Sequence, residues 1–159
     1  MKNESNSTDF SHLDESGRAR MVDVSEKAVT RRVAEASCSV RISADTVARL
    51  SNLPKGDAHS VARIGGIQAA KRTGEWIPLA HPLSPEDIEV TLCEVPDGVQ
   101  IRSRVVVTAR TGAEMEALVA CAGAALSLYD MVKAVEREAV ITDLRLERKT
   151  GGARGDYRR

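Results

Sequence analysis

Residues 113–137 have the pattern of a long helix that is apolar on nearly every side. Between residues 117 and 131, only Ser127 and Asp130 interrupt a run of alanine, leucine, valine and other apolar residues. A helix of this kind is buried on most sides, so the rest of the chain must fold around it. Its alanines and Gly123 allow tight packing, either against the same chain or against another subunit.

Strand and helix patterns are mixed around this helix. Four segments have the apolar pattern of strands: residues 34–43, 88–95, 99–109 and 140–148. Two more helices are expected: residues 45–50 and 58–73. Pro96-Asp97-Gly98 is a hairpin turn, and Asp57 is placed to cap the second of these helices. Mixed elements with an explicit hairpin predict an α+β fold, with an antiparallel or mixed sheet and helices on one face.

The length and the composition predict one domain between two polar ends. The chain has 159 residues, and 42% of them are hydrophobic, which is enough for a core. We expect a flexible N-terminal arm at residues 1–20, a single α+β domain at residues 21–150 and a flexible C-terminal tail at residues 151–159.

Charge and cysteine content exclude several classes of protein. Lys plus Arg and Asp plus Glu both total 23, so the basic excess of a general nucleic-acid binder is absent. The longest mainly apolar run, residues 117–129, is shorter than the roughly 20 residues that span a bilayer, so we expect no membrane association. Cys38, Cys93 and Cys121 are far apart and lack metal-ligand spacing. They are typical of reduced thiols, which predicts a cytoplasmic protein without a metal site.

The helix at residues 58–73 carries two kinds of surface. Its apolar stripe consists of Val61, Ile64 and Ile67. The adjacent Gly65 and Gly66 cost a helix about 1 kcal/mol each relative to alanine, which indicates that another backbone approaches closely there. Lys71 continues the stripe, either as a lysine that extends from the edge of the core or as a cation presented to an anion in a cleft.

Two carboxylates of the long helix stand out. Lys133 follows Asp130 by three residues, so the two share a face and form either a structural ion pair or a coupled acid/base pair in a cleft. Glu116 precedes Asp130 by fourteen residues, which separates their backbones by about 21 Å in a straight helix. If both residues serve active sites, those sites are built from two subunits.

His81 lies in the proline-rich segment 77–85, which is expected to be an irregular loop. Pro82 restricts the backbone of the histidine before it. A histidine in a rigid loop just after a helix that ends in cations is a candidate proton carrier.

Five fragments in a fixed order carry a resemblance to a known family: KGDAHSVARIGGIQAAKRT, IPLAHPL, ARTGAEMEAL, LYDMVKAVER and ERKTGG. Together they closely resemble the cyclic pyranopterin monophosphate synthases, the molybdenum cofactor biosynthesis protein C family. The likeness runs from residue 21 to about residue 152. Any one fragment would be weak evidence, but five in order at similar spacing are strong.

The resemblance implies a ferredoxin-like fold assembled as a hexamer of three dimers, with active sites at subunit interfaces. It implies an enzyme, a lyase, that acts on 3′,8-cyclo-7,8-dihydroguanosine 5′-triphosphate. The substrate would be rearranged to cyclic pyranopterin monophosphate with release of pyrophosphate.

Matching the motifs residue by residue implies a set of functional side chains. Asp130, Lys133 and His81 match the residues expected to move protons. The expected substrate-binding residues are Arg32 (with Arg31 beside it), Lys55, Lys71, Leu79, Ala80, His81, Met115, Glu116 and Lys149. The chain has no P-loop motif, so cationic side chains are expected to hold the phosphates, and Glu116 to accept from the N–H donors of the base. We expect no required cofactor, and Mg²⁺ only as a companion of the substrate's phosphates.

The sequence departs from the family's usual motifs at three places. Ala80 and Val132 stand where relatives often have cysteine, which suggests that those thiols serve packing. Ala153 replaces a common cation of the tail, and Arg154 follows it. The rival hypothesis from another class is a catalytically silent homologue that binds a nucleotide or serves as a pathway scaffold. The complete set of Asp130, Lys133 and His81 favours the enzyme.

Overall fold

One antiparallel sheet of five strands forms the centre of the protein. A computed structural model describes residues 13–14, 16–152 and 155–159. The strands are β1 Thr30–Arg41, β2 Asp87–Val95, β3 Gly98–Ala109, β4 Val140–Thr150 and β5 Tyr157–Arg158. Their order in the sheet is β2-β3-β1-β4-β5, and each neighbouring pair is antiparallel.

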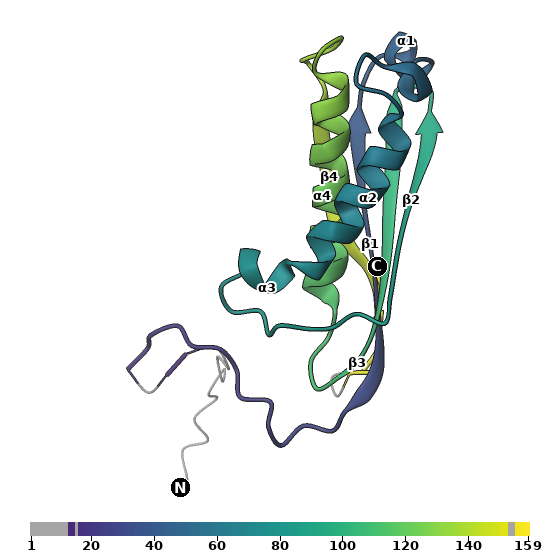
Figure 1. Cartoon of the computed structure of the whole chain (residues 1–159). Helices are drawn as coiled ribbons and strands as arrows, with labels where there is room; N and C mark the ends of the chain where they lie inside the picture. The colour runs from purple at the N-terminus through teal and green to yellow at the C-terminus, as the bar shows by residue number, and fades with distance from the viewer. Residues whose placement is uncertain (1–12, 15, 153–154) are drawn as a thin grey trace, which may run out of the picture.

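Helices cover one face of this sheet. They are α1 Ala44–Val47, the short 3-10 helix η1 Leu50–Asn52, α2 Ala58–Lys71, α3 Thr73–Trp76 and α4 Glu114–Val132. The two long helices, α2 and α4, lie side by side on the sheet (Figure 1). The order β1-α2-β2-β3-α4-β4 with this strand arrangement is a ferredoxin-like α+β fold, which confirms the predicted class.

The apolar helix α4 is the centre of the core. Ala117, Ala124 and Leu128 are fully buried, and so is Ile101 of β3 beneath them. By length and composition, α4 is the one helix in the described residues that is apolar enough to cross a membrane, and 61% of that window is buried inside the fold. Its hydropathy is therefore that of a core helix, as the sequence pattern predicts.

Small residues let α2 and α4 approach closely, as the paired glycines indicate. A Cβ added to Gly66 would lie 2.8 Å from the carbonyl oxygen of Ala120, and one added to Gly123 would lie 3.2 Å from the carbonyl oxygen of Gly65. Within the neighbouring apolar stripe, Ile67 packs against the core, whereas Val61 and Ile64 do not face it. Val61 is 42% exposed and Ile64 is 65% exposed, because the small residues occupy the inward side of α2.

Several element boundaries differ from the sequence expectation. The last helix ends at Val132 rather than at residue 137, and Glu136 beyond it accepts hydrogen bonds from the backbone N–H and the hydroxyl of Ser43. The chain also forms α3, which was not expected. At the C-terminus, Tyr157 pairs with Lys149 of β4, where a flexible tail was expected. Most of the expected N-terminal arm (residues 1–12 and 15), as well as Ala153 and Arg154, lies outside the described residues.

Candidate active site

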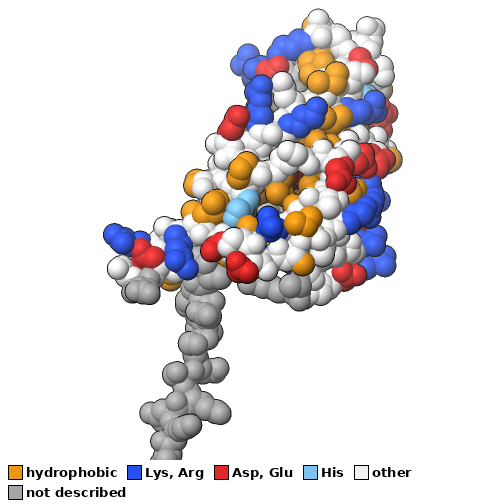
Figure 2. Space-filling model, turned by 60° about the horizontal axis from the view of Figure 1, so that its bottom comes forward, with side chains coloured by type: hydrophobic (Ala, Val, Ile, Leu, Met, Phe, Trp, Pro, Cys, Tyr) orange, Lys and Arg blue, Asp and Glu red, His pale blue; other side chains and the backbone are white. Residues whose placement is uncertain are grey.

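A pocket of about 580 Å³ lies where β1 begins, β4 ends and α4 begins. The irregular loop after α3 and the segment before β1 complete its walls. Seven residues that the sequence singles out line this one pocket: Arg32, Leu79, Ala80, His81, Met115, Glu116 and Lys149. Figure 2 shows this end of the molecule, where basic, histidine and hydrophobic side chains lie close together on the surface.

Glu116 is the buried carboxyl of the pocket. It lies in the first turn of α4, only 2% of its surface is exposed, and burial raises its pKa to about 7. The neighbouring Glu114 adds to this rise, whereas a hydrogen bond from the backbone of Glu116 opposes it. Near neutral pH this carboxyl is therefore able to hold or release a proton, which an exposed glutamate does not do.

His81 is held by the segment that precedes β1. Its Nε2 lies 2.8 Å from the carbonyl oxygen of Val22. A carbonyl oxygen only accepts, so Nε2 is the protonated nitrogen and donates this bond. The contact fixes the ring within the loop and leaves Nδ1 to accept a proton or a hydrogen bond.

The two predicted cations of the pocket are held in different ways. Arg32 donates from Nε to the carbonyl oxygen of Ala109 at 3.1 Å and from Nη2 to that of Arg110 at 3.0 Å. Lys149 instead pairs with Glu114, with 3.1 Å between Nζ and Oε1. Arg32 thus keeps an uncompensated positive charge among the described residues, which suits it to bind an anion.

Two further cations line the pocket that the residue-by-residue matching missed: Lys27 and Arg110. Arg110 donates from Nε to the carbonyl oxygen of Lys27 at 3.1 Å and so ties the segment before β1 to the end of β3. Arg110 lies in the quoted fragment ARTGAEMEAL, and Lys27 lies near residue 21, where the likeness to the family begins. Only the folded chain shows that they face the same space.

A second group of predicted residues lies at the other end of α4. Asp130 accepts from Lys133 at 2.7 Å through Oδ1 and from Lys55 at 2.8 Å through Oδ2. The hydrogen bond from Lys133, and then that from Lys55, lowers the pKa of Asp130 to about 2. The predicted ion pair is therefore confirmed. In the single chain this pair is about half exposed, since the side chain of Asp130 is 53% and that of Lys133 49% exposed.

The helix itself separates these two groups. Glu116 lies in the first turn of α4 and Asp130 in its last turn, about 21 Å away along the axis. Lys71 lies exposed at the end of α2 and is not among the residues that line the pocket. One chain thus holds the predicted residues in two places, which supports the idea that complete sites need two subunits.

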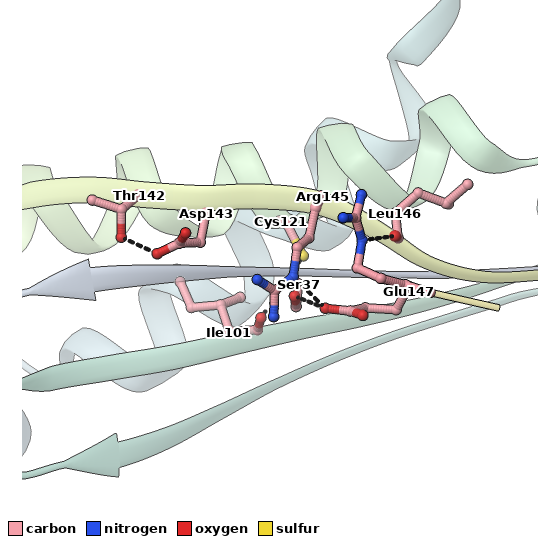
Figure 3. A network of polar contacts seen from close by, with 9 residues as sticks. Ser37, Ile101, Cys121, Thr142, Asp143, Arg145, Leu146 and Glu147 are labelled. Atoms are coloured by element: carbon pink, nitrogen blue, oxygen red, sulfur yellow. Dashed lines mark hydrogen bonds and ion pairs between the residues drawn. The ribbon is translucent and has the colours of Figure 1, made fainter.

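The open face of the sheet forms another groove, of about 650 Å³, which contains none of the predicted residues. Figure 3 shows the side chains of Ser37 and Arg145 pointing toward Glu147. Arg145 Nε lies 2.8 Å from the Glu147 carboxylate, and the Ser37 hydroxyl donates to it at 2.5 Å. Arg148 likewise pairs with Glu35. These pairs neutralise part of the groove's charge, whereas the pocket around Arg32 is the place where the residues predicted from the sequence motifs gather.

Within the described parts of the chain, no three His, Cys, Asp or Glu side chains are grouped so as to hold a metal ion. The fold and the pocket define a ferredoxin-like α+β protein with a cationic pocket beside a buried carboxyl. The model of the MoaC family matches residues 21–152. The chain belongs to this family.

Curated relatives agree with this assignment. A protein of Streptomyces griseus subsp. griseus, named cyclic pyranopterin monophosphate synthase, is 54% identical over 94% of this chain and 86% of its own length. A protein of the same name from Nocardioides sp. is 55% identical over 94% of this chain and 95% of its own length. The cyclic pyranopterin monophosphate synthase 3 of Mycobacterium tuberculosis (strain H37Rv) is 53% identical over 94% of this chain and 86% of its own length.

Proposed function

We propose that this protein is a cyclic pyranopterin monophosphate synthase of molybdenum cofactor biosynthesis. It converts 3′,8-cyclo-7,8-dihydroguanosine 5′-triphosphate to cyclic pyranopterin monophosphate and releases pyrophosphate. The family match and the names of its relatives support this reaction. The observation that carries the proposal is the single pocket in which Arg32, His81, Glu116 and Lys149 meet.

Phosphate chemistry explains the cations of the pocket. To form a cyclic monophosphate, an oxygen of the substrate attacks the α-phosphorus, and the bond to the β-phosphate breaks as pyrophosphate leaves. Arg32 and Lys149, joined by Lys27 and Arg110, are suited to bind the charge that develops on the departing pyrophosphate. Lys55 and Lys71 are assigned to the same task from the partner subunit or from the rim. Glu116 accepts hydrogen bonds from N–H donors of the base, beside Leu79, Ala80 and Met115.

We assign proton movement to His81 and to the group of Asp130, Lys133 and Lys55 at the other end of α4. With a pKa of about 2, Asp130 is a weak base in the free chain, so its main effect there is to hold the ammonium groups of Lys133 and Lys55. Those lysines and Nδ1 of His81 then give and take protons as the rings open and close. Burial of Asp130 in an assembled site would raise its pKa toward a useful range.

The proposed assembly is a hexamer, a trimer of dimers, in the cytoplasm. Such an assembly needs more than one kind of contact surface. Exposed apolar side chains lie on the helices α2, α3 and α4: Val61, Ile64, Trp76 and Leu126. A second copy that covers the helix layer would bury them and bring the Asp130 end of one chain toward the pocket of the other. Light scattering that gave a monomer at micromolar concentration would remove this part of the proposal.

The activity is proposed to need no cofactor held by the protein, with Mg²⁺ entering only alongside the substrate's phosphates. Turnover in the presence and absence of EDTA tests this point. A reaction that stops in EDTA and returns with Mg²⁺ would show that the phosphates need the ion.

The decisive experiment supplies the cyclised GTP derivative and measures two products: pyrophosphate, and the pterin after its chemical oxidation to a fluorescent form. We expect both from the wild type in equal amounts, and neither from Asp130→Asn. Folded, oligomeric wild-type protein that bound the substrate without forming either product would instead support the silent homologue or scaffold.

A further inference from the structure

Lys149 shares the wall of the pocket with Glu114, a carboxylate to which neither the residue-by-residue matching nor the proposed reaction gives a role. Glu114 Oε1 lies 3.1 Å from Lys149 Nζ, and the two side chains are 30% and 32% exposed. The contact joins the first turn of α4 to the end of β4. Both residues face the pocket, so whatever binds there meets the pair together.

The loop before α4 is shaped to allow this contact. Glu114 bends back over Gly112, where an added Cβ would lie 2.7 Å from the Glu114 carboxyl carbon. A residue other than glycine at position 112 would therefore require the Glu114 carboxylate to move from this place. The N-cap residue, Ala113, makes no side-chain hydrogen bond to the helix, and the carboxylate is directed toward Lys149.

The position of the Lys149 ammonium group depends on Glu114 more than the position of the Arg32 guanidinium depends on any one partner. The guanidinium of Arg32 is fixed by two main-chain carbonyl oxygens. Lys149 has a flexible four-carbon stem, and Glu114 is the one hydrogen-bond partner of its ammonium group among the described residues. Without Glu114 the ammonium would sample many positions outside the pocket.

We propose that Glu114 is a positioning residue, which holds the ammonium group of Lys149 in place for a phosphate of the substrate. An ammonium group has three donors, so it can bind Glu114 and a phosphate oxygen at once. Glu114 acts through Lys149 and does not itself touch the phosphate, which its negative charge would repel. This role rests on the proposed function for the identity of the phosphate ligand.

A double-mutant cycle tests the role, with inorganic pyrophosphate as the calorimetric probe and KM and kcat for the full substrate. Glu114→Gln is expected to weaken pyrophosphate binding about three- to tenfold and to raise KM with little change in kcat. In the Lys149→Ala background the same change should leave binding equal or make it tighter, because only the repulsion is removed. Glu114→Asp keeps the charge but loses the reach, so it should behave as Glu114→Gln does.

The exposed carboxylate Glu86, which does not line the pocket, provides the matched control as Glu86→Gln, and it should leave binding unchanged. Equal losses from Glu114→Gln in both backgrounds, or no loss in the wild-type background, would overturn the proposal. So would wild-type binding by Glu114→Asp. If the wild type binds pyrophosphate and the cycle holds, but no pterin is formed, the proposed reaction fails while the positioning role stands.

Discussion

Two carboxylates on one helix experience opposite environments. Glu116, in the first turn of α4, is buried in the pocket, and its pKa is raised to about 7. Asp130, in the last turn, is half exposed between Lys55 and Lys133, and its pKa is lowered to about 2. The same functional group is thus adjusted for two tasks: one end is able to exchange a proton near neutral pH, and the other permanently holds two cations.

This difference fits the proposal that neither end is a complete site. The pocket has the buried carboxyl, the histidine and several cations, but it lacks the triad of Asp130, Lys55 and Lys133. That triad in turn lies on an open surface where water weakens its charges. Combining the two ends would desolvate the triad and strengthen its interactions with a ligand. The following changes act on one end or the other.

The largest effect is expected from Asp130→Asn, which removes the charge but preserves the shape. We expect turnover to fall about 10²- to 10⁴-fold, because Lys55 and Lys133 lose the anion that holds them. The rate of pyrophosphate release measures the loss of turnover, and circular dichroism checks that the variant is folded. Turnover near the wild-type rate would end the functional assignment of this end of the helix.

Gly66→Ala disturbs the packing of α2 against α4, the helix that carries both Glu116 and Asp130. The added Cβ would lie 2.8 Å from the carbonyl oxygen of Ala120 and 3.0 Å from the Cβ of Ala124, so α2 and α4 must separate. We expect the free energy of unfolding to drop by about 1–3 kcal/mol in spite of the better helix propensity of alanine. Gly74→Ala is the matched control, since its nearest neighbour would be 3.4 Å away. Equal stability of the two variants in urea would contradict the close approach.

Glu116→Gln tests the buried end through the pH dependence of stability. The folded-state pKa of about 7 lies above the usual value of 4.5, so the folded protein binds the proton more tightly than the unfolded chain. Stability from this group is therefore present at low pH and declines as pH rises from about 4.5 to about 7. The glutamine variant should lack that decline and melt several degrees higher above pH 7. Parallel melting curves for both proteins from pH 4 to pH 8 would show that Glu116 is not desolvated.

The smallest effect is expected from Arg145→Gln on the open face of the sheet. This residue pairs with Glu147 at a surface where it is 47% exposed, so its loss should change the free energy of unfolding by less than about 0.5 kcal/mol. Substrate affinity should stay at the wild-type value, whereas Arg32→Gln in the pocket should weaken it about tenfold. Weaker substrate binding by the Arg145 variant would instead indicate that the substrate binds in the groove on the open face of the sheet.

The sequence predicts the fold well because its signals are local. The hairpin turn at residues 96–98, the cap at Asp57 and the apolar helix each appear where expected. The i, i+3 pair of Asp130 and Lys133 also follows from helix geometry alone. The orientation of α2 does not follow, because its small inward face and its larger apolar stripe both suit a core, and only packing against α4 decides between them.

The site shows the same contrast between local signals, which the sequence contains, and long-range contacts, which it does not show. The motifs name seven residues that meet in one pocket, but they do not show that the other four lie elsewhere or that Lys27 and Arg110 line the same pocket. That meeting depends on contacts such as the one between Arg110 and the carbonyl oxygen of Lys27, which are remote in sequence. The exposure of Asp130 is likewise a property of the folded surface, and no spacing in the sequence encodes it.

Mixing two inactive variants tests most directly whether complete sites combine two chains. Asp130→Asn disables one end and His81→Ala the other, and the two proteins are co-expressed so that they assemble together. Each mixed dimer would contain one doubly altered site and one site of wild-type composition, so we predict recovery of roughly a quarter of the wild-type turnover. If instead both ends act within one chain, the co-expressed mixture would remain as inactive as either variant alone, and the composite site would be wrong.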